Sequence, residues 1–223
     1  MGRLRSRPQH LDKAPLRYPA KGVRAMDSGG PMKVTAFNGS ARKDGNTSVL
    51  IKSVFTEIEK EGIQTELVNL SGKKIGGCIA CFKCFENKNK RCSIKDDAIN
   101  ECIEKMIEAD GIILASPTYF SNVSAEMKAL IDRAGLVAFA NTGMLRHKVG
   151  AAVTVARRTG ASQALMAMNT FFSCFEMFTV GSNYPNMAIG LNKGDVEQDS
   201  MGLETMKTLG TNIAFLLKKL NHH

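Results

Sequence analysis

Apolar and polar residues follow two periods along residues 33–220, one typical of strands and one typical of helices. Short apolar runs predict buried strands at residues 34–37, 65–70, 111–115, 148–156 and 178–180. Between them, apolar residues at helical spacing predict helices at about residues 49–58, 96–107, 123–139, 162–172 and 202–220. Strands that alternate with helices in this way favour a parallel sheet with helices on both faces.

Four of the six cysteines fall within fifteen residues of one predicted loop, residues 76–95. Their spacing is C-x2-C-x2-C-x7-C, formed by Cys78, Cys81, Cys84 and Cys92. A disulfide framework would distribute its cysteines through the fold to close longer loops. Successive x2 spacings resemble the ferredoxin arrangement, in which one loop wraps a cubane, whereas zinc sites more often use two separated C-x2-C pairs. The pattern favours an iron–sulfur cluster and leaves open a zinc site or a loop of redox-active or idle thiols.

The other two cysteines, Cys102 and Cys174, lie within helical apolar patterns. Free cysteines in such positions behave as small apolar residues, so both are expected to be buried in the core.

Polar loops follow three of the predicted strands, at residues 38–47, 116–122 and 156–161. In an open α/β sheet, ligands bind at the carboxyl ends of the strands. The first loop ends at a helix N-terminus, where free N–H groups and the helix dipole favour an anion. It lacks both the Gly-Lys-Ser/Thr ending of a nucleotide loop and the G-x-G-x-x-G of a dinucleotide loop, so a phosphate monoester fits better. The alternative is a polar helix cap, in which Asn46 or Thr47 satisfies the backbone donors.

The net charge of +9 suggests nucleic-acid binding until it is mapped along the chain. Residues 1–31 carry seven Lys or Arg against two Asp, which accounts for five of the nine net positive charges. We expect these residues to be a basic, disordered extension, or a segment that lies upstream of a true start at Met26 or Met32. Residues 32–223 are expected to form the folded domain. The extension lacks the apolar centre of a secretory signal, and no run approaches the roughly 18 apolar residues of a membrane span. A cytoplasmic protein with reduced thiols and neither a nucleic-acid nor a membrane partner is expected.

Three segments carry a further signal: GSARKDGNT (residues 39–47), GCIACFKCF…CSIKDD (residues 77–97) and ASPTYFSNVSAEMKALIDR (residues 115–133). Together they resemble the flavodoxin-like NAD(P)H-dependent FMN reductases, and within them the iron–sulfur flavoprotein branch. The resemblance covers about residues 33–217 and implies a doubly wound, five-stranded parallel sheet of order 2-1-3-4-5. In that branch, a motif C-x2-C-x2-C-x4–7-C holds a [4Fe-4S] cluster beside FMN. One departure is Ala41, where the family's phosphate loop usually has proline.

The resemblance also implies roles for individual residues. The FMN phosphate would be held by Ser40, Arg42, Asn46 and Thr47. The isoalloxazine ring would be wrapped at one edge by Pro117, Thr118, Tyr119, Phe120 and Asn122, and flanked on its other side by residues 156–160, which include Arg157 and Gly160. The cluster would be ligated by Cys78, Cys81, Cys84 and Cys92. No catalytic acid, base or nucleophile is expected, because a flavin carries the chemistry, and His147 is expected to be a surface residue.

The implied function is an FMN-dependent oxidoreductase that passes electrons from a ferredoxin-like or NAD(P)H donor to oxygen, peroxide, a quinone or a small metabolite. Relatives form dimers or tetramers, so a homo-oligomer is expected. Lys83, Lys88, Lys90 and Arg91 would suit an acidic donor such as ferredoxin, or would form an ordinary solvated face. The alternatives are a cluster-free NAD(P)H-dependent FMN or quinone reductase, a flavodoxin-type electron carrier, and a nucleic-acid-binding module suggested by net charge alone.

Overall fold

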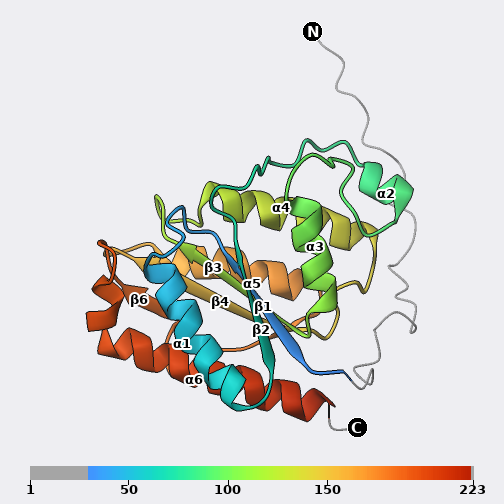
Figure 1. Cartoon of the computed structure of the whole chain (residues 1–223). Coiled ribbons are helices and arrows are strands. Elements are labelled where there is room, and N and C mark those ends of the chain that lie inside the picture. Colours follow the sequence, from blue (N-terminus) through green and yellow to red (C-terminus); the bar gives the residue numbers. More distant parts are fainter. Residues whose placement is uncertain (1–29, 222–223) are drawn as a thin grey trace.

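The computed structural model describes residues 30–221, which form a six-stranded sheet between two layers of helices (Figure 1). Every paired strand runs parallel to its neighbour. The order is β2-β1-β3-β4-β5, with β6 also paired to β4. The strands are β1 (Lys33–Asn38), β2 (Gln64–Asn69), β3 (Gly111–Pro117), β4 (Val149–Ala156), β5 (Phe178–Thr179) and β6 (Met187–Ile189). The predicted order is confirmed, and β6 is an addition to it.

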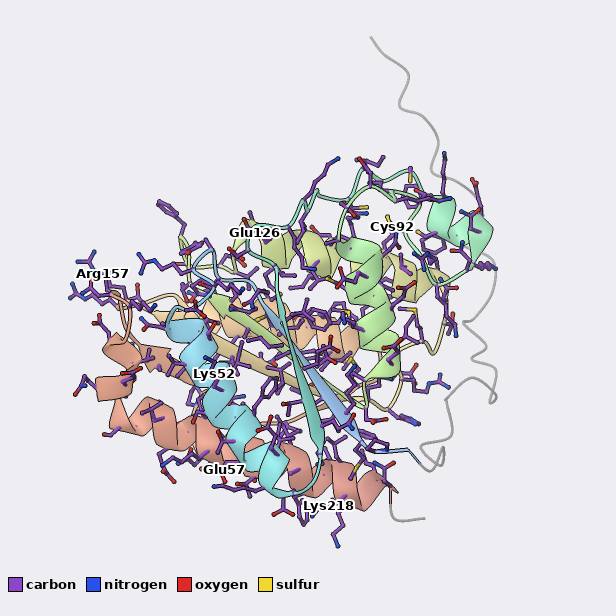
Figure 2. The ribbon with its side chains drawn as sticks, in the orientation of Figure 1. Lys52, Glu57, Cys92, Glu126, Arg157 and Lys218 are labelled. Carbon is purple, nitrogen blue, oxygen red and sulfur yellow. The ribbon has the colours of Figure 1, made fainter. Side chains whose placement is uncertain are left out.

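Helices cover both faces of the sheet, as predicted. They are α1 (Asn46–Lys60), α2 (Lys83–Asn87), α3 (Ile99–Glu108), α4 (Ala125–Ala140), α5 (Ala161–Cys174) and α6 (Ser200–Asn221), with a 3-10 turn, η2 (Asp195–Gln198). Helices α1 and α6 lie side by side on one face, and α3, α4 and α5 cover the other (Figure 1). An ion pair between Lys218 and Glu61 joins the ends of α6 and α1, and Figure 2 shows Lys218 beside the last turn of α1.

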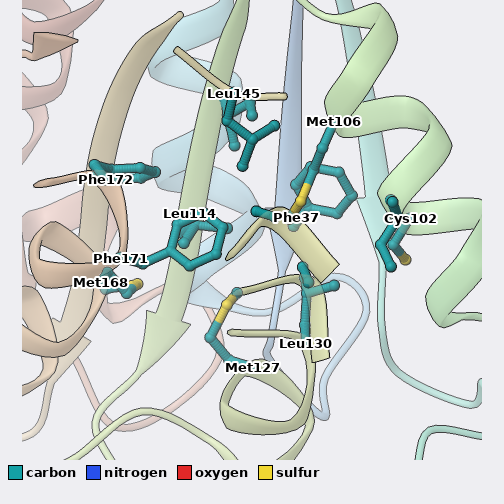
Figure 3. Close-up of a cluster of buried hydrophobic side chains, with 14 of the residues drawn as sticks. Phe37, Cys102, Met106, Leu114, Met127, Leu130, Leu145, Met168, Phe171 and Phe172 are labelled. Carbon is teal, nitrogen blue, oxygen red and sulfur yellow. The ribbon is translucent and has the colours of Figure 1, made fainter. Parts of the chain in front are cut away.

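The buried strands send alternate side chains into two separate cores. Phe37 and Leu114 point into the core under α3, α4 and α5, together with Met127 and Phe172 (Figure 3). Their chain neighbours, such as Ile113, point into the core under α1 and α6. This alternation follows from the two-residue period of a strand. Each fully buried large apolar side chain contributes roughly 1.5–3 kcal/mol, so the two cores fix the sheet and the loops at its ends.

The fifth position of the sheet is divided between two short strands. β5 pairs with Val149 and Gly150 near the start of β4, whereas β6 pairs with Thr154–Ala156 at its end. The seven residues between them, 180–186, include Gly181 and Pro185, neither of which favours a continuous strand. The sequence predicted one strand here because three apolar residues at 187–189 are too few to show a period.

The predicted helix boundaries are correct to within a few residues. The helix predicted from residue 96 begins at Ile99, whose N–H is accepted by Asp97 Oδ1 at 3.2 Å. The short helix α2, inside the cysteine loop, was not predicted. The predicted basic extension lies almost wholly outside the described residues. No helix within residues 30–221 is long and apolar enough to cross a membrane.

Candidate functional site

Four loops meet at the carboxyl ends of the strands and enclose a cleft. They are residues 38–47 after β1, 117–122 after β3, 156–160 after β4 and 190–194 after β6. The cavity between them has a volume of about 130 Å³. The cleft is lined by Ser40, Arg42, Asn46, Thr47, Pro117, Thr118, Tyr119, Val155, Arg157, Gly190 and Leu191.

The N-terminus of α1 points its first N–H groups at this cleft without a side-chain cap. Gly45 is the capping residue, and no side chain accepts a hydrogen bond there. The hydroxyl of Ser40, which is buried, accepts the N–H of Arg42 at 3.1 Å and keeps its own proton to donate. The capping interpretation of Asn46 and Thr47 is therefore wrong. The arrangement is that of an anion site, in which uncapped N–H groups and a hydroxyl face the ligand.

Asn46 uses its side chain to hold the neighbouring loop. Its Nδ2 donates to Asn192 O at 2.8 Å, and its Oδ1 accepts the N–H of Gly194 at 2.9 Å. A Cβ on Gly190 would lie 2.7 Å from the same Nδ2, so only glycine allows this approach. Arg42 adds a bond from Nη1 to Leu191 O at 3.0 Å. Residues 38–47 and residues 190–194 therefore form one unit, and Asn46 also stands at the N-terminus of α1.

The loop after β3 is closed on itself by two backbone hydrogen bonds. Tyr119 N donates to Asn122 O at 2.9 Å, and Asn122 N donates to Tyr119 O at 3.1 Å. The turn leaves Phe120 fully exposed with a positive φ of 47°. Gly160 packs against this turn, because a Cβ at its position would lie 2.7 Å from Ser121 Cα. An aromatic ring is thus held outward at the rim of the cleft.

Eight of the eleven predicted cofactor-binding residues line the cleft. The other three, Phe120, Asn122 and Gly160, shape the two loops at its rim. Sequence reasoning missed three lining residues, Val155, Gly190 and Leu191. Gly190 and Leu191 could have been found, because Gly190, Asn192 and Gly194 mark a loop after an apolar stretch. His147, as predicted, is exposed, and it stacks on Phe178 with ring centroids 5.5 Å apart.

The four clustered cysteines line a second cavity, of about 20 Å³. The other residues around it are mainly apolar: Ile79, Phe82, Ser93, Ile94, Arg133, Leu136 and Val137. Cys84 is buried, Cys92 is half-buried, and Cys78 and Cys81 are exposed. The segment is strained, because Ala80, Phe82, Lys88 and Lys90 all have positive φ angles. Helix α2 carries Cys84 against α4 at the base of this cavity.

Two buried polar side chains from the neighbouring helices fix Cys92. Asn100 Oδ1 accepts the N–H of Cys92 at 2.8 Å, and its Nδ2 donates to Cys92 O and to Ile94 O. Arg133 Nη2 donates to Cys92 Sγ at 3.2 Å. Hydrogen bonds to Asp97 and Cys92 outweigh the opposing effect of burial and raise the pKa of Arg133. Cys92 is thus held at both its backbone and its sulfur.

The thiols of the cavity differ in acidity. The Ser93 hydroxyl, with help from the Lys83 N–H, lowers the pKa of Cys81, whose Sγ lies 3.3 Å from Ser93 Oγ. Burial raises the pKa of Cys84. Outside the cavity, burial raises the pKa of Cys102 to about 11, as its predicted core position implies. The burial predicted for Cys174 is wrong: it is the last residue of α5, and its side chain is exposed.

The sulfurs surround a cavity rather than a point. Within residues 30–221, no three Cys, His, Asp or Glu side chains lie close enough together to hold a single metal ion. A mononuclear zinc site needs each sulfur about 2.3 Å from one ion. A cubane instead accepts one thiolate at each of four irons, so its ligands are spread around its faces. The chemistry of this donor set, four cysteines around one cavity, fits a cubane.

Helix α4 connects the two regions. Ser124 caps it beside the cleft, accepting the N–H of Met127 at 3.2 Å. Leu136 and Val137, near its other end, line the cysteine cavity, about 18 Å further along at 1.5 Å per residue. Figure 2 shows Cys92 and Arg157, one from each region, on different sides of the molecule.

Comparisons with known proteins agree with this arrangement. Residues 32–191, which include both regions, match the family described as NADPH-dependent FMN reductase. An iron-sulfur flavoprotein of Methanocaldococcus jannaschii is 40% identical over 194 residues, covering 84% of this chain and 98% of that protein. An iron-sulfur flavoprotein of Methanosarcina thermophila is 31% identical over 189 residues, covering 84% of this chain and 96% of that protein. A WrbA-like flavodoxin of Agrobacterium tumefaciens superposes with a TM-score of 0.60 at 16% identity, covering 85% of this chain and 99% of that one, which shows a flavodoxin-like fold.

Proposed function

Because this chain belongs to the NADPH-dependent FMN reductase family and is a flavin-dependent oxidoreductase, we propose that it carries a [4Fe-4S] cluster in addition to FMN. It would take electrons from a ferredoxin-like or NAD(P)H donor and deliver them to a small acceptor such as oxygen, peroxide, a quinone or a metabolite. The observation that carries this proposal is the single apolar cavity lined by Cys78, Cys81, Cys84 and Cys92. Relatives named iron-sulfur flavoproteins support it.

The cleft would hold FMN by its phosphate and by its ring. Bound FMN supplies a centre that accepts one or two electrons. The first-turn N–H groups of α1, the Ser40 hydroxyl and the Arg42 guanidinium would bind the phosphate. Thr118 and Tyr119 would orient the ring from one side and Arg157 from the other. Leu191 would exclude water at the phosphate end, where it is fastened to Arg42.

The cysteine cavity would hold the cluster through its four thiolates. A bound [4Fe-4S] cluster supplies a one-electron centre whose potential depends on charge, hydrogen bonds and exposure. Cys84 and Val137, which are buried, and the half-buried Leu136 would form its inner side. Cys78 and Cys81, which are exposed, would form the side facing solvent or a donor.

The solvent side of the cysteine loop supports the proposed docking of an acidic donor. Three large apolar side chains, Ile79, Phe82 and Phe85, are exposed there. The exposed cations Lys83, Lys88 and Lys90 lie in the same stretch of chain. Exposed apolar and basic side chains in one loop suit a transient partner with an acidic surface, whose association would slow as salt is raised.

We also propose that the protein forms a homo-oligomer, a dimer or a tetramer, in the cytoplasm. A shallow groove beside α5 supports this, because Leu165, Met166 and Pro185 line it and Met166 is 69% exposed. None of the six cysteines, all of which lie within residues 30–221, forms a disulfide, which agrees with a reducing compartment. Light scattering on a size-exclusion column gives the number of chains.

The cofactors can be counted on one anaerobically purified sample. An absorption spectrum with flavin bands and a broad charge-transfer shoulder is expected, with about one FMN, four irons and four sulfides per chain. Flavin without iron or sulfide would contradict the cluster and assign the chain as a cluster-free reductase. The absence of both would contradict the proposal as a whole.

A further inference from the structure

Arg133 is the largest fully buried side chain of the described residues, and it lies against the cysteine cavity. It belongs to α4, and its partners all belong to the cysteine segment or to the start of α3. Nη1 is paired with the Asp97 carboxylate and donates to Gly76 O at 3.1 Å, and Nη2 donates to Cys92 Sγ at 3.2 Å and to Ile94 O at 3.4 Å. Figure 2 labels Cys92 at this side of the molecule, near α3 and α4.

The side chain does more than join two segments, because one of its donors is directed at a sulfur. Burying a guanidinium is costly, and a purely structural contact could be made by apolar residues of similar volume. A further donor, Nε, is buried and has no partner among residues 30–221. Arg133 therefore places a positive charge, one N–H···S bond and one unused N–H beside a cavity of thiols.

We propose that Arg133 is a positioning residue for the cluster, which fixes Cys92 Sγ and raises the reduction potential of the cluster. This inference rests on the proposed function, since it requires the cluster. A hydrogen bond to a ligating sulfur withdraws negative charge from it, and the reduced cluster carries one more negative charge than the oxidised one. The bond therefore stabilises the reduced form more than the oxidised form, and the potential rises.

The nearby charges limit the size of this effect. Asp97, which is 3% exposed, neutralises Arg133 over longer distances, so the short-range N–H···S bond dominates. The lysines of the loop are exposed, where water and salt screen them. Arg133 should thus affect the potential more than any surface cation of this loop.

The test is the double variant R133M/D97N, which replaces both partners of the buried ion pair at once and so leaves no unpaired buried charge. Asn at position 97 keeps an oxygen that can accept the Ile99 N–H. The matched control is K95Q, which removes one exposed positive charge three residues from Cys92. The potentials of cluster and FMN are measured by spectroscopic redox titration of each anaerobically purified protein, alongside its iron content.

We expect the double variant to retain iron and to shift the reduction equilibrium of the cluster at least tenfold toward the oxidised form. For one electron, tenfold corresponds to a potential lower by about 59 mV. The FMN potential and the K95Q cluster potential should not change. An unchanged cluster potential in R133M/D97N would overturn the inference while the proposed function stands.

Two other outcomes are also decisive. If R133M/D97N loses its iron, R133K is titrated instead, because it keeps the charge but not the forked donor. A lower cluster potential in R133K supports the inference, and an unchanged one overturns it. If the unmodified protein holds no iron, the proposed function fails first and the inference fails with it.

Discussion

The cleft at the carboxyl ends of the strands and the cysteine cavity are built in different ways within one chain. The cleft is made of loops that continue directly from β1, β3, β4 and β6, and their polar groups bond to one another. The cysteine segment lies between β2 and α3, outside the sheet, and is held by Asn100 and Arg133 from the helices beside it. One site is thus supported by the sheet and the other by side chains.

The distribution of backbone strain is consistent with this difference. Among the described residues, eight that are not glycine have positive φ angles, and six of them lie in the two sites. Phe120 and Ser121 belong to the cleft, whereas four belong to residues 80–90 of the cysteine loop. The cysteine loop should therefore depend on its occupant for stability, while the cleft is largely preformed.

The largest expected effect comes from removing a cluster ligand. C92A should lose nearly all of its iron, because an apolar side chain leaves one iron without a thiolate. Its FMN content should not change, because Cys92 does not line the cleft. Iron, sulfide and FMN are counted on the same anaerobic sample.

The control is C174S, which changes an exposed cysteine outside the cavity. It should keep all of its iron. Loss of FMN from C92A, or of iron from C174S, would contradict the separation of the two sites.

A second substitution should affect only the cleft. R42Q removes the cation beside the proposed phosphate site, and a hydrogen bond to a charged group contributes about 1.5–3 kcal/mol. Because Arg42 is exposed, we expect the lower end of this range, roughly a tenfold weaker affinity for FMN. The quenching of FMN fluorescence on binding measures it. The control K43Q, which removes an exposed neighbouring charge, should bind FMN as tightly as the unmodified protein does. If R42Q and K43Q lose the same affinity for FMN, the effect is one of general charge and not of the phosphate site.

Two glycines, Gly160 at the rim of the cleft and Gly143 in the loop between α4 and β4, separate backbone strain from crowding. G143A places a side chain at a φ of 81° with nothing within 4 Å, so it should cost about 1 kcal/mol of unfolding free energy. G160A adds a Cβ 2.7 Å from Ser121 Cα at a φ of 87°, so it should cost roughly 3 kcal/mol. Urea unfolding of the cofactor-free proteins measures both. Equal costs would mean that the turn at Ser121 yields easily, and that Gly160 does not hold it in place.

The smallest effect is a difference in pH dependence within the cysteine cavity. Alkylation requires a thiolate, whose fraction rises as the pH passes the pKa of the thiol. The Ser93 hydroxyl lowers the pKa of Cys81 and burial raises that of Cys84, so iodoacetamide should modify Cys81 at the lower pH in iron-free protein. S93A should move the Cys81 profile to higher pH without moving that of Cys84. Mass spectrometry of the peptides gives both profiles, and coincident profiles would contradict the assignment.

The sequence predicted the sheet well because β1, β3 and β4 are buried runs with a clear apolar pattern. It did not predict β6, because three residues are too few to show a strand period. It did not predict α2, because a five-residue helix inside a strained loop is too short to show a helical period. Among site residues, local motifs identified the loop after β1 that lines the cleft and the four cysteines that line one cavity. They could not reveal that the side chain of Asn46 holds residues 192–194, or that Arg133 reaches Cys92, since these contacts join segments 146 to 148 and 41 residues apart.

The central claim is that one chain holds two separate redox centres, one in each region. An anaerobic titration with a strong reductant, followed by absorption, counts the electrons that each chain accepts. FMN accepts two electrons and a [4Fe-4S] cluster accepts one, so we expect about three per chain, falling to about two in C92A. If the unmodified protein also accepts only about two electrons per chain, the account is contradicted.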